Sequence, residues 1–310
     1  MEYRALGRSG IEVSRIILGC GNFGGIGSAP AFFGQGESRD QAFAIMDAAW
    51  TAGITTFDTA DAYGGGRSES YIGDWMRSHG LRPVLTTKTF APMTGGADSG
   101  LSRERIRRQV DSSLERLGVE RLDLYLAHAM DPETQLEETV SVFDELKRVG
   151  KIGAWGGSNV DVPWIEAARP AWVQNSYSLL DRDDETGVLP VCARDGLGYT
   201  PYSPLAGGWL TGKYRRGEAL PEGSRMTMRP EPYAHLQRDA VFDTLEAFAA
   251  QARERDTTPA TLALAWLLAD PRVTALVIGP RRPEQLQPAL DAVALNLSPV
   301  ERDAITELFP

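Results

Sequence analysis

The sequence of 310 residues contains few of the residue types that cross-link a chain or bind a metal. Its two cysteines, Cys20 and Cys192, supply no disulfide framework and are typical of a protein in a reducing cytoplasm, where we expect it to work. Its three histidines form no cluster with cysteines or carboxylates at metal-ligand spacing, so we expect no metal site. The G-x-S-x-G turn is also absent, which disfavours a Ser/His/Asp hydrolase.

A long apolar run is missing too. No run approaches the ~20 apolar residues that a membrane-spanning helix requires, and Met1 to Arg4 show no apolar signal core. We therefore expect no anchor, no export signal and no membrane partner. The chain also lacks excess positive charge, since its net charge is -10 and its pI is near 5.0, which disfavours nucleic acid as a partner. What it does contain, 42% hydrophobic and 24% charged residues, is typical of a globular protein.

Strand-like and helix-like segments alternate along the chain. Eight apolar segments are predicted as strands, at residues 16–18, 54–57, 84–88, 122–127, 151–155, 172–175, 198–203 and 273–278. Because helical segments lie between most of them, the strands are expected to form a parallel sheet. Eight such units at this length predict an α/β fold, a closed (β/α)8 TIM barrel. An open doubly wound sheet is the alternative, and it would need a break in the order that the sequence does not show.

The ends of the chain are predicted to add to this barrel. Residues 3–15 are expected to form a short hairpin before the first barrel strand. Residues 283–293 and 299–308 are expected to form additional helices after the last strand. No linker divides the sequence, so we predict one domain over residues 1–310.

One glycine-rich stretch suggests a different fold. Residues 19–24 read G-C-G-N-F-G directly after the first barrel strand and match the G-x-G-x-x-G pattern of a dinucleotide-binding turn. In that turn the glycines open a helix. Here the chain continues into residues 25–30, whose two glycines and Pro30 cannot continue as a helix. We therefore reject the Rossmann interpretation and predict that residues 25–38 form a loop over the barrel mouth.

Ionisable side chains stand at the ends of three successive predicted strands. Asp58 follows the strand 54–57, and Tyr63 lies in the loop after it. Lys88 ends the next strand, and His128 follows the strand after that. The carboxyl ends of the strands are where a parallel barrel keeps its active site. A buried carboxylate requires a partner, so we expect Asp58 to pair with Lys88.

These four residue types suit the transfer of a proton. We expect the lysine cation to lower the pKa of Tyr63 below about 10, so that its phenol donates a proton to a carbonyl oxygen that gains charge. His128 would orient that carbonyl or assist the proton. The set contains no nucleophile, so a nicotinamide would supply a hydride. Each residue alone also has a structural interpretation: Asp58 could cap a turn, Tyr63 and His128 could be packed side chains, and Lys88 could be a surface lysine. The combination of the four favours an active site.

The motifs around these residues resemble those of the aldo-keto reductase superfamily over nearly the whole chain. Asp58 and Tyr63 match its pattern of Asp, four residues and Tyr, and Lys88 ends the sequence Thr-Thr-Lys. Residues 123–128 read D-L-Y-L-A-H, similar to its D-L-Y-x-x-H. The resemblance implies a catalytic tetrad of Asp58, Tyr63, Lys88 and His128, with Tyr63 as the proton donor. It implies an NADPH-dependent reductase of a small-molecule aldehyde or ketone.

The resemblance also implies the residues that bind NADP(H). Ser158, Asn159 and Gln174 would hold the nicotinamide carboxamide. Arg281 and Arg282 precede a predicted helix N-terminus and would pair with the 2′-phosphate, which favours NADPH. Tyr202, in the Y-S-P-L motif, would stack on the nicotinamide. The other residues assigned to the cofactor lie in glycine-containing segments and are Gly21, Asn22, Ser203, Pro204, Leu205, Gly207, Lys213, Gly279 and Gln285.

Several aromatic residues are candidates for the walls of the substrate pocket, namely Phe23, Phe32, Phe33, Trp155 and Trp209. Two other functions stay open. A reductase of nucleotide-linked deoxysugars would want arginines for its anionic substrate, and Arg225 and Arg229 lie in the segment 205–238. A potassium-channel β subunit would use the same fold and cofactor site as a redox-sensing binding module. The presence of His128, as in an active reductase, favours the enzyme.

Overall fold

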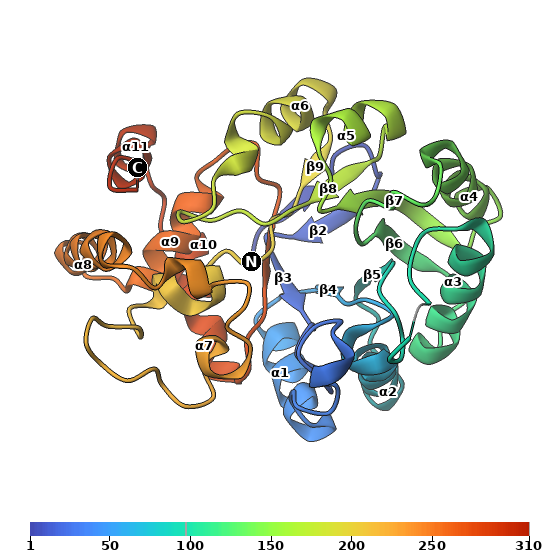
Figure 1. Ribbon diagram of the computed structural model, residues 1–310, viewed down its shortest axis with the longest axis horizontal. Coiled ribbons are helices and arrows are strands. Elements are labelled where there is room, and N and C mark those ends of the chain that lie inside the picture. Colours follow the sequence, from blue (N-terminus) through green and yellow to red (C-terminus); the bar gives the residue numbers. More distant parts are fainter. Residues whose placement is uncertain (97, 310) are drawn as a thin grey trace.

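The computed structural model of the protein describes residues 1–96 and 98–309. Eight parallel strands form one sheet in the order β10-β3-β4-β5-β6-β7-β8-β9, and Figure 1 shows this sheet curled around a centre with helices outside it. The strands are β3 (Ile16–Gly19), β4 (Thr56–Asp58), β5 (Val84–Thr89), β6 (Leu122–Ala127), β7 (Ile152–Ser158), β8 (Trp172–Gln174), β9 (Gly198–Tyr199) and β10 (Leu276–Ile278). The predicted α/β barrel is therefore confirmed. Residues 97 and 310, which the predicted domain includes, lie outside the described residues.

The barrel closes between its last two strands. The N–H of Thr274 donates to the carbonyl of Tyr199 at 2.8 Å, and the N–H of Val277 donates to the carbonyl of Pro201 at 2.9 Å. Pro201 has no N–H with which to return a hydrogen bond. Strand β9 is shorter than the predicted strand 198–203, and beyond its end Pro201 contributes only its carbonyl to this seam.

Helices cover the outside of the barrel where the sequence predicts them. Ser38 and Gln41 form a reciprocal capping pair at the start of the first helix, and Gly80 and Gly118 end the next two in the left-handed conformation. The helices that follow successive strands are α1 (Arg39–Thr51), α2 (Arg67–His79), α3 (Arg103–Leu117), α4 (Leu136–Arg148), α5 (Val162–Ala168) and α6 (Val188–Asp195).

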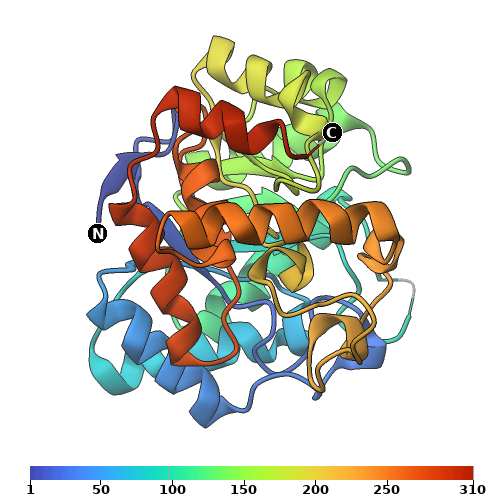
Figure 2. The ribbon, with the colours of Figure 1, turned by 90° about the vertical axis from the view of Figure 1, so that its left-hand side faces the viewer.

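The C-terminal part of the chain forms a group of helices on one side of the barrel (Figures 1 and 2). They are α8 (Asp239–Glu254), α9 (Pro259–Leu268), α10 (Gln287–Ala294) and α11 (Pro299–Thr306). The predicted helix 283–293 is present as the 3-10 turn η6 (Pro283–Leu286) followed by α10, and α11 corresponds to the predicted helix 299–308. The predicted additional C-terminal helices are thus confirmed.

The N-terminal hairpin covers the amino ends of the strands. It consists of β1 (Tyr3–Ala5) and β2 (Glu12–Ser14), which pair in antiparallel fashion. Leu6 and Val13 are buried in one cluster with Ile17, Leu126 and Trp172, so the hairpin closes the inner core of the barrel. This leaves the carboxyl ends of the strands as the open end.

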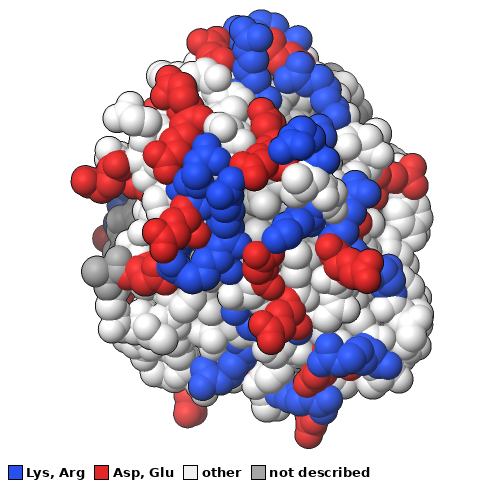
Figure 3. Space-filling view, turned by 90° about the vertical axis from the view of Figure 1, so that its right-hand side faces the viewer, with Lys and Arg blue, Asp and Glu red and all other residues white. Residues whose placement is uncertain are grey.

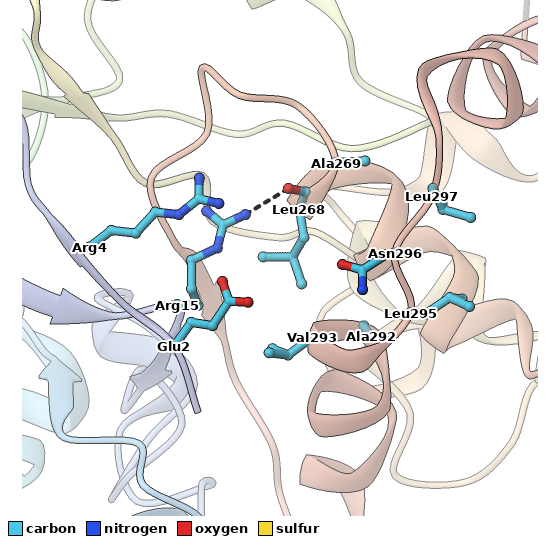
Figure 4. A pocket seen from close by; sticks show the side chains of 10 residues that line it. All are labelled: Glu2, Arg4, Arg15, Leu268, Ala269, Ala292, Val293, Leu295, Asn296 and Leu297. Atoms are coloured by element: carbon cyan, nitrogen blue, oxygen red, sulfur yellow. Dashed lines mark hydrogen bonds between the residues drawn. The ribbon is translucent and has the colours of Figure 1, made fainter.

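Arg15 ties this hairpin to the C-terminal helices (Figure 4). Its guanidinium donates to the carbonyls of Val273 at 2.7 Å, Thr274 at 2.6 Å and Leu268 at 2.6 Å. It lines a small cavity of about 110 Å³ together with Glu2, Arg4 and the end of α10. Since the arginine donates to three carbonyls, we interpret this cavity as part of the structural core.

Two loops frame the open end of the barrel. Residues 19–24 open no helix, as predicted, and the loop 25–38 contains the 3-10 turn η1 (Pro30–Phe32) and a bridge between Phe23 and Glu37. The segment 205–238 contains only the short elements η4 (Ala206–Thr211), α7 (Arg225–Met228) and η5 (Ala234–Leu236). Among the helices formed by the described residues, none combines the length and apolar character that a membrane crossing requires.

Candidate active site

The carboxyl ends of β4 and β5 hold a buried ion pair. Asp58 Oδ1 accepts from Lys88 Nζ, and the two side chains are only 4% and 1% exposed. Lys88 Nζ also donates to the carbonyl of Thr59 at 2.9 Å, and Gln174 Nε2 donates to Asp58 Oδ2 at 2.9 Å. Each carboxylate oxygen therefore has a donor, which offsets the cost of burying two charges. The expected pairing of Asp58 with Lys88 is present.

The lysine of this pair is held as a cation. Burial by itself would lower the pKa of Lys88, but Asp58 and then Tyr63 act in the opposite direction, and the net effect raises the pKa of Lys88 above its ordinary value. The site thus keeps a fixed positive charge at its base.

Tyr63 lies between this cation and His128. Its ring centroid is 5.1 Å from Lys88 Nζ, and its hydroxyl is 3.4 Å from His128 Nε2. The chain turns directly after Tyr63 through three glycines, Gly64 to Gly66, which all have the positive φ that other residues adopt only at a cost. A Cβ at Gly21 would lie 3.5 Å from Cε2 of Tyr63, so this glycine packs against the phenol ring. The structure therefore brings the four predicted catalytic residues together.

The expected direction of the Tyr63 pKa is wrong. Burial raises the pKa of Tyr63 above its ordinary value, and Lys88 offsets only part of that effect. The physical reason is that desolvation of the phenolate outweighs its attraction to a lysine that is already paired with Asp58. Tyr63 is consequently protonated at neutral pH, which a proton donor requires.

His128 is uncharged in this environment. Burial, and in second place the charge of Lys88, lower the pKa of His128 to about 3. Its Nδ1 is buried and has no hydrogen-bond partner among the described residues. A neutral imidazole beside Tyr63 can accept or donate one hydrogen bond without adding charge to the site.

The residues predicted to bind the nicotinamide lie next to the tetrad. Ser158 ends β7, and Asn159 follows with a left-handed φ of 56°. Asn159 Nδ2 donates to the carbonyl of His128 at 2.8 Å, and its Oδ1 accepts from the hydroxyl of Tyr202 at 2.6 Å. Gln174, at the end of β8, reaches Asp58. Since β7 extends to Ser158 rather than ending at the predicted Trp155, Ser158 is fixed by the sheet.

The Y-S-P-L segment forms a tight turn next to these residues. Ser203 and Gly207 both have positive φ, at 54° and 64°. The Ser203 hydroxyl is 2.7 Å from the Tyr233 hydroxyl, and a Cβ at Gly207 would lie 2.5 Å from the Tyr233 ring. Glycine is therefore required at 207 both for the backbone angle and for the close approach of Tyr233. Within this turn Pro204 is buried and Leu205 is half-buried.

Farther from the tetrad, three cations share one region. Burial, and then the charges of Arg225 and Arg281, lower the pKa of Lys213. Arg225 Nη2 donates to Asn22 Oδ1 at 3.2 Å, which joins the segment 205–238 to the loop after β3. The sequence suggests Arg225 only for an anionic substrate, because a segment without periodicity does not indicate its place beside Lys213 and Arg281.

The other predicted residues of this region lie around Arg281. Its backbone N–H donates to Gln285 Oε1 at 2.7 Å. A Cβ at Gly279 would lie 3.9 Å from Asn22 Nδ2. Arg282 is exposed. A residue that the sequence did not single out, Glu37, pairs with Arg281, since its Oε1 accepts from Arg281 Nε at 2.5 Å.

These residues fit a nicotinamide dinucleotide. One end offers the amide and hydroxyl groups of Ser158, Asn159 and Tyr202 beside the proton-handling tetrad, and the other end offers the cations Lys213, Arg225 and Arg281 for phosphates. The turn at residues 203–207, with positive φ at Ser203, Ala206 and Gly207, is the part of the site that the resemblance assigns to the pyrophosphate. Within residues 1–96 and 98–309, no three His, Cys, Asp or Glu side chains are grouped to hold a metal ion.

Three of the aromatic residues predicted for the substrate pocket belong to the core instead. Phe23 and Trp209 have no exposed surface, and Trp209 packs on Tyr214 with ring centroids 5.0 Å apart. Trp155 points away from the barrel axis, since its Nε1 donates to Asp144 Oδ1 of α4 at 2.8 Å. Trp155 lies on β7, a strand that is buried on both faces, and such a strand gives no sequence signal for the direction of a given side chain.

Phe32 and Phe33 remain candidates for the pocket. Both are half-buried in the loop over the open end. The guanidinium of Arg229 lies 5.4 Å from the Phe32 ring, and Phe33 is packed against Gly65, just after Tyr63. The loop 25–38 thus places aromatic surface beside the proposed proton donor.

The fold and the site together define a class: a (β/α)8 barrel with a buried tyrosine, an ion pair and a neutral histidine at the carboxyl ends of its strands. The family model of the aldo/keto reductase family matches residues 15–309, and the chain belongs to this family. The resemblance of its motifs is therefore confirmed. Members of the family are oxidoreductases that use nicotinamide cofactors.

The chain is similar along its length to several known proteins. It is 36% identical to an uncharacterized oxidoreductase, YrpG, of Bacillus subtilis, over 100% of this chain and 96% of that protein. It is 35% identical to a putative voltage-gated potassium channel subunit beta of Schizosaccharomyces pombe, over 94% of this chain and 88% of that protein. It is 32% identical to an NADH-specific methylglyoxal reductase of Escherichia coli, over 99% of this chain and 98% of that protein.

Proposed function

We propose that the protein is a nicotinamide-dependent reductase of a small aldehyde or ketone, with Tyr63 as the proton donor. The observation that carries this proposal is the position of the Tyr63 hydroxyl, 3.4 Å from the neutral His128 and beside the Lys88 cation. When bound, the nicotinamide would supply a hydride to the carbonyl carbon. The protein would then supply the proton to the carbonyl oxygen.

Each residue of the tetrad has a separate part in this proposal. Lys88 stabilises the negative charge that develops on the phenol oxygen as Tyr63 gives up its proton. Asp58 keeps Lys88 charged and in position, and is not itself a base. His128 binds the carbonyl oxygen through a neutral ring nitrogen, because a pKa of about 3 leaves it uncharged at neutral pH.

We propose NADP(H) as the cofactor. Lys213, Arg225 and Arg281 support this choice, since three neighbouring cations suit a ligand with one phosphate more than NAD(H) carries. We assign the nicotinamide end to Ser158, Asn159, Gln174 and Tyr202, as the resemblance implies.

The test is a panel of aldehydes, ketones and sugars offered to the purified protein with NADPH or NADH carrying deuterium at the transferable position. We expect at least one carbonyl compound to be reduced, with the deuterium on the former carbonyl carbon. If the protein binds the cofactor but oxidises it with none of these compounds, the enzymatic proposal is wrong.

A second candidate is a cofactor-binding subunit of a membrane channel, and the 35% identical relative named as a potassium channel subunit beta favours it. The two candidates differ in their need for catalysis. A binding subunit would be recovered from membranes at equal stoichiometry with a channel and would turn over slowly. Failure of the carbonyl panel combined with such recovery would support this second candidate.

The deoxysugar alternative stays a hypothesis with no added support. Arg225 donates to Asn22, and Arg229 Nη1 donates to the carbonyl of Ile26 at 3.1 Å. Both arginines therefore connect the segment 205–238 to the loop after β3. A nucleotide-linked sugar in the carbonyl panel tests this alternative directly.

We further propose that the protein works in the cytoplasm as one domain, with a small molecule as its main partner. Both cysteines are unpaired and buried. On the face over α3 and α4, acidic and basic side chains intermingle (Figure 3), as in the pairs of Arg107 with Glu145 and Arg108 with Asp98. Such a mixed face does not favour a polyanionic partner.

A further inference from the structure

The pairing of Glu37 with Arg281 is unusual for its position. Glu37 lies in an exposed loop, yet its side chain is only 2% exposed. Its Oε1 accepts from Arg281 Nε at 2.5 Å, and its Oε2 is buried with no hydrogen-bond partner among the described residues. A buried carboxylate oxygen without a donor is costly, so this atom is available for a ligand that brings one.

The backbone fixes Glu37 in this place. Its N–H donates to the carbonyl of Asn22 at 2.8 Å, and its carbonyl accepts from the N–H of Gly24 at 2.9 Å. A Cβ at Gly36 would lie 2.0 Å from the carbonyl oxygen of Asn22, so only glycine permits this close approach. Glu37 is thereby held rigidly beside Asn22 and Arg281, two residues of the proposed cofactor site.

Arg281 is largely occupied by these contacts. Besides Glu37, its Nη1 donates to the carbonyl of Gly223 at 2.6 Å. A phosphate that binds Arg281 would share its guanidinium with the carboxylate of Glu37, and the two anions repel each other. A ribose hydroxyl, in contrast, can donate to the free carboxylate oxygen.

We propose that Glu37 determines cofactor specificity by competing with the 2′-phosphate of NADPH for Arg281 and by accepting a ribose hydroxyl of NADH. This inference rests on the proposed function, because it assumes that a nicotinamide dinucleotide binds at this site. Lys213 and Arg225 still favour the phosphate, so the protein discriminates only weakly between the two cofactors. The wild-type protein accordingly binds NADPH less than about tenfold more tightly than NADH, a difference of about 1.4 kcal/mol.

The experiment is calorimetric titration of the wild-type protein and Glu37→Gln with NADPH and NADH. Glutamine keeps the size of the side chain but removes the charge, so it frees Arg281 for the phosphate. We expect the ratio of NADPH to NADH affinity to rise by about tenfold or more, since the phosphate no longer shares Arg281 with a negative charge. The matched control is Glu284→Gln, which removes an exposed charge close to Arg281 in sequence and should change the ratio less than about twofold.

A second variant shows whether Glu37 acts through the arginine. Arg281→Gln should lower the NADPH affinity, and Glu37→Gln should raise the ratio of NADPH to NADH affinity less in the Arg281→Gln background than in the wild-type protein. An unchanged ratio in Glu37→Gln, with a thermal midpoint close to wild type, overturns the inference. If Glu37→Gln does not fold, the wild-type ratio decides: a preference for NADPH above about tenfold overturns the inference.

The failure of this inference is distinguishable from the failure of the proposed function. If neither cofactor binds the wild-type protein, the proposed function is wrong. If both bind and the variants leave their ratio unchanged, only the role of Glu37 is wrong.

Discussion

Asp58 and Asp61 lie on the same short segment and are both buried, but their surroundings differ. Asp58 has a donor for each oxygen, from Lys88 and from Gln174. Neither oxygen of Asp61 accepts a hydrogen bond within the described residues, and its nearest cation, Arg105, is 3.7 Å away. Burial, and then the charge of Glu69, raise the pKa of Asp61 to about 7.

The difference shows that burial alone does not determine the charge of a carboxylate. Glu69, which lies close to Asp61, accepts from Thr87 at 2.5 Å and from Arg116 at 2.6 Å, and so takes donors that Asp61 lacks. A carboxylate with complete hydrogen bonding can serve as a fixed counter-charge, as Asp58 does for Lys88. A buried carboxylate without hydrogen-bond donors, such as Asp61, is instead protonated up to near neutral pH.

Lys88→Met should have the largest effect, because it leaves Asp58 buried without its cation. We expect the free energy of unfolding to fall by about 3–5 kcal/mol, measured by urea denaturation. Carbonyl reduction should be lost as well, since the phenolate charge of Tyr63 loses its stabilisation. Lys151→Met is the matched control, because Lys151 pairs with Asp111 at the surface and should contribute about 1 kcal/mol or less. Equal effects of the two substitutions would mean that the buried pair of Lys88 and Asp58 contributes no more to stability than the surface pair of Lys151 and Asp111.

Asp61→Asn should have a smaller effect of opposite sign. The pKa of Asp61 is raised from 3.8 to about 7, so the folded protein binds this proton more tightly than the unfolded chain. That contribution is complete below the unfolded pKa and is lost as the pH rises through the folded pKa. As the pH rises from 3.8 to about 7, the free energy of unfolding of the variant should therefore increase relative to that of the wild type. The total change in this difference should be on the order of 1–4 kcal/mol.

The measurement is urea denaturation of both proteins across that pH range. Asp303→Asn, which removes an exposed carboxylate on α11, is the control and should show no such trend. A stability difference that is independent of pH would mean that Asp61 titrates normally.

The smallest expected effect concerns His128, whose charge should not change across the neutral pH range. Because burial and Lys88 lower the pKa of His128 to about 3, its ring should stay neutral throughout the neutral range. Nitrogen chemical shifts of the three histidine rings, with the His128→Gln variant for assignment, measure this. A titration of His128 near the ordinary value of about 6.5 would contradict our description of the site.

Much of this site could be predicted because its residues stand at the ends of strands. Asp58, Lys88 and His128 follow apolar segments of clear strand character, and a parallel barrel brings such ends to one face. The positions of Phe23 and Trp209 could not be predicted in the same way. An aromatic residue beside a glycine has the same local sequence whether it lines a pocket or fills the core.

The pKa of Tyr63 and the place of Glu37 depend on contacts far apart in the sequence. The balance between desolvation of Tyr63 and its attraction to Lys88 depends on how deeply the ring is packed, which residue order does not specify. Glu37 meets Arg281 only because β3 and β10 are neighbours in the closed barrel. No local pattern predicts such an ion pair.

The most direct test of the account is the single-turnover rate of Tyr63→Phe with NADPH and the best carbonyl compound of the panel. We predict a rate at least about a hundredfold below wild type, in the range of general acid catalysis, with the NADPH affinity within about twofold of wild type. Tyr71→Phe, which removes a phenol oxygen from α2, should keep the wild-type rate. A Tyr63→Phe protein that reduces the compound at a near-normal rate would contradict the central role of Tyr63.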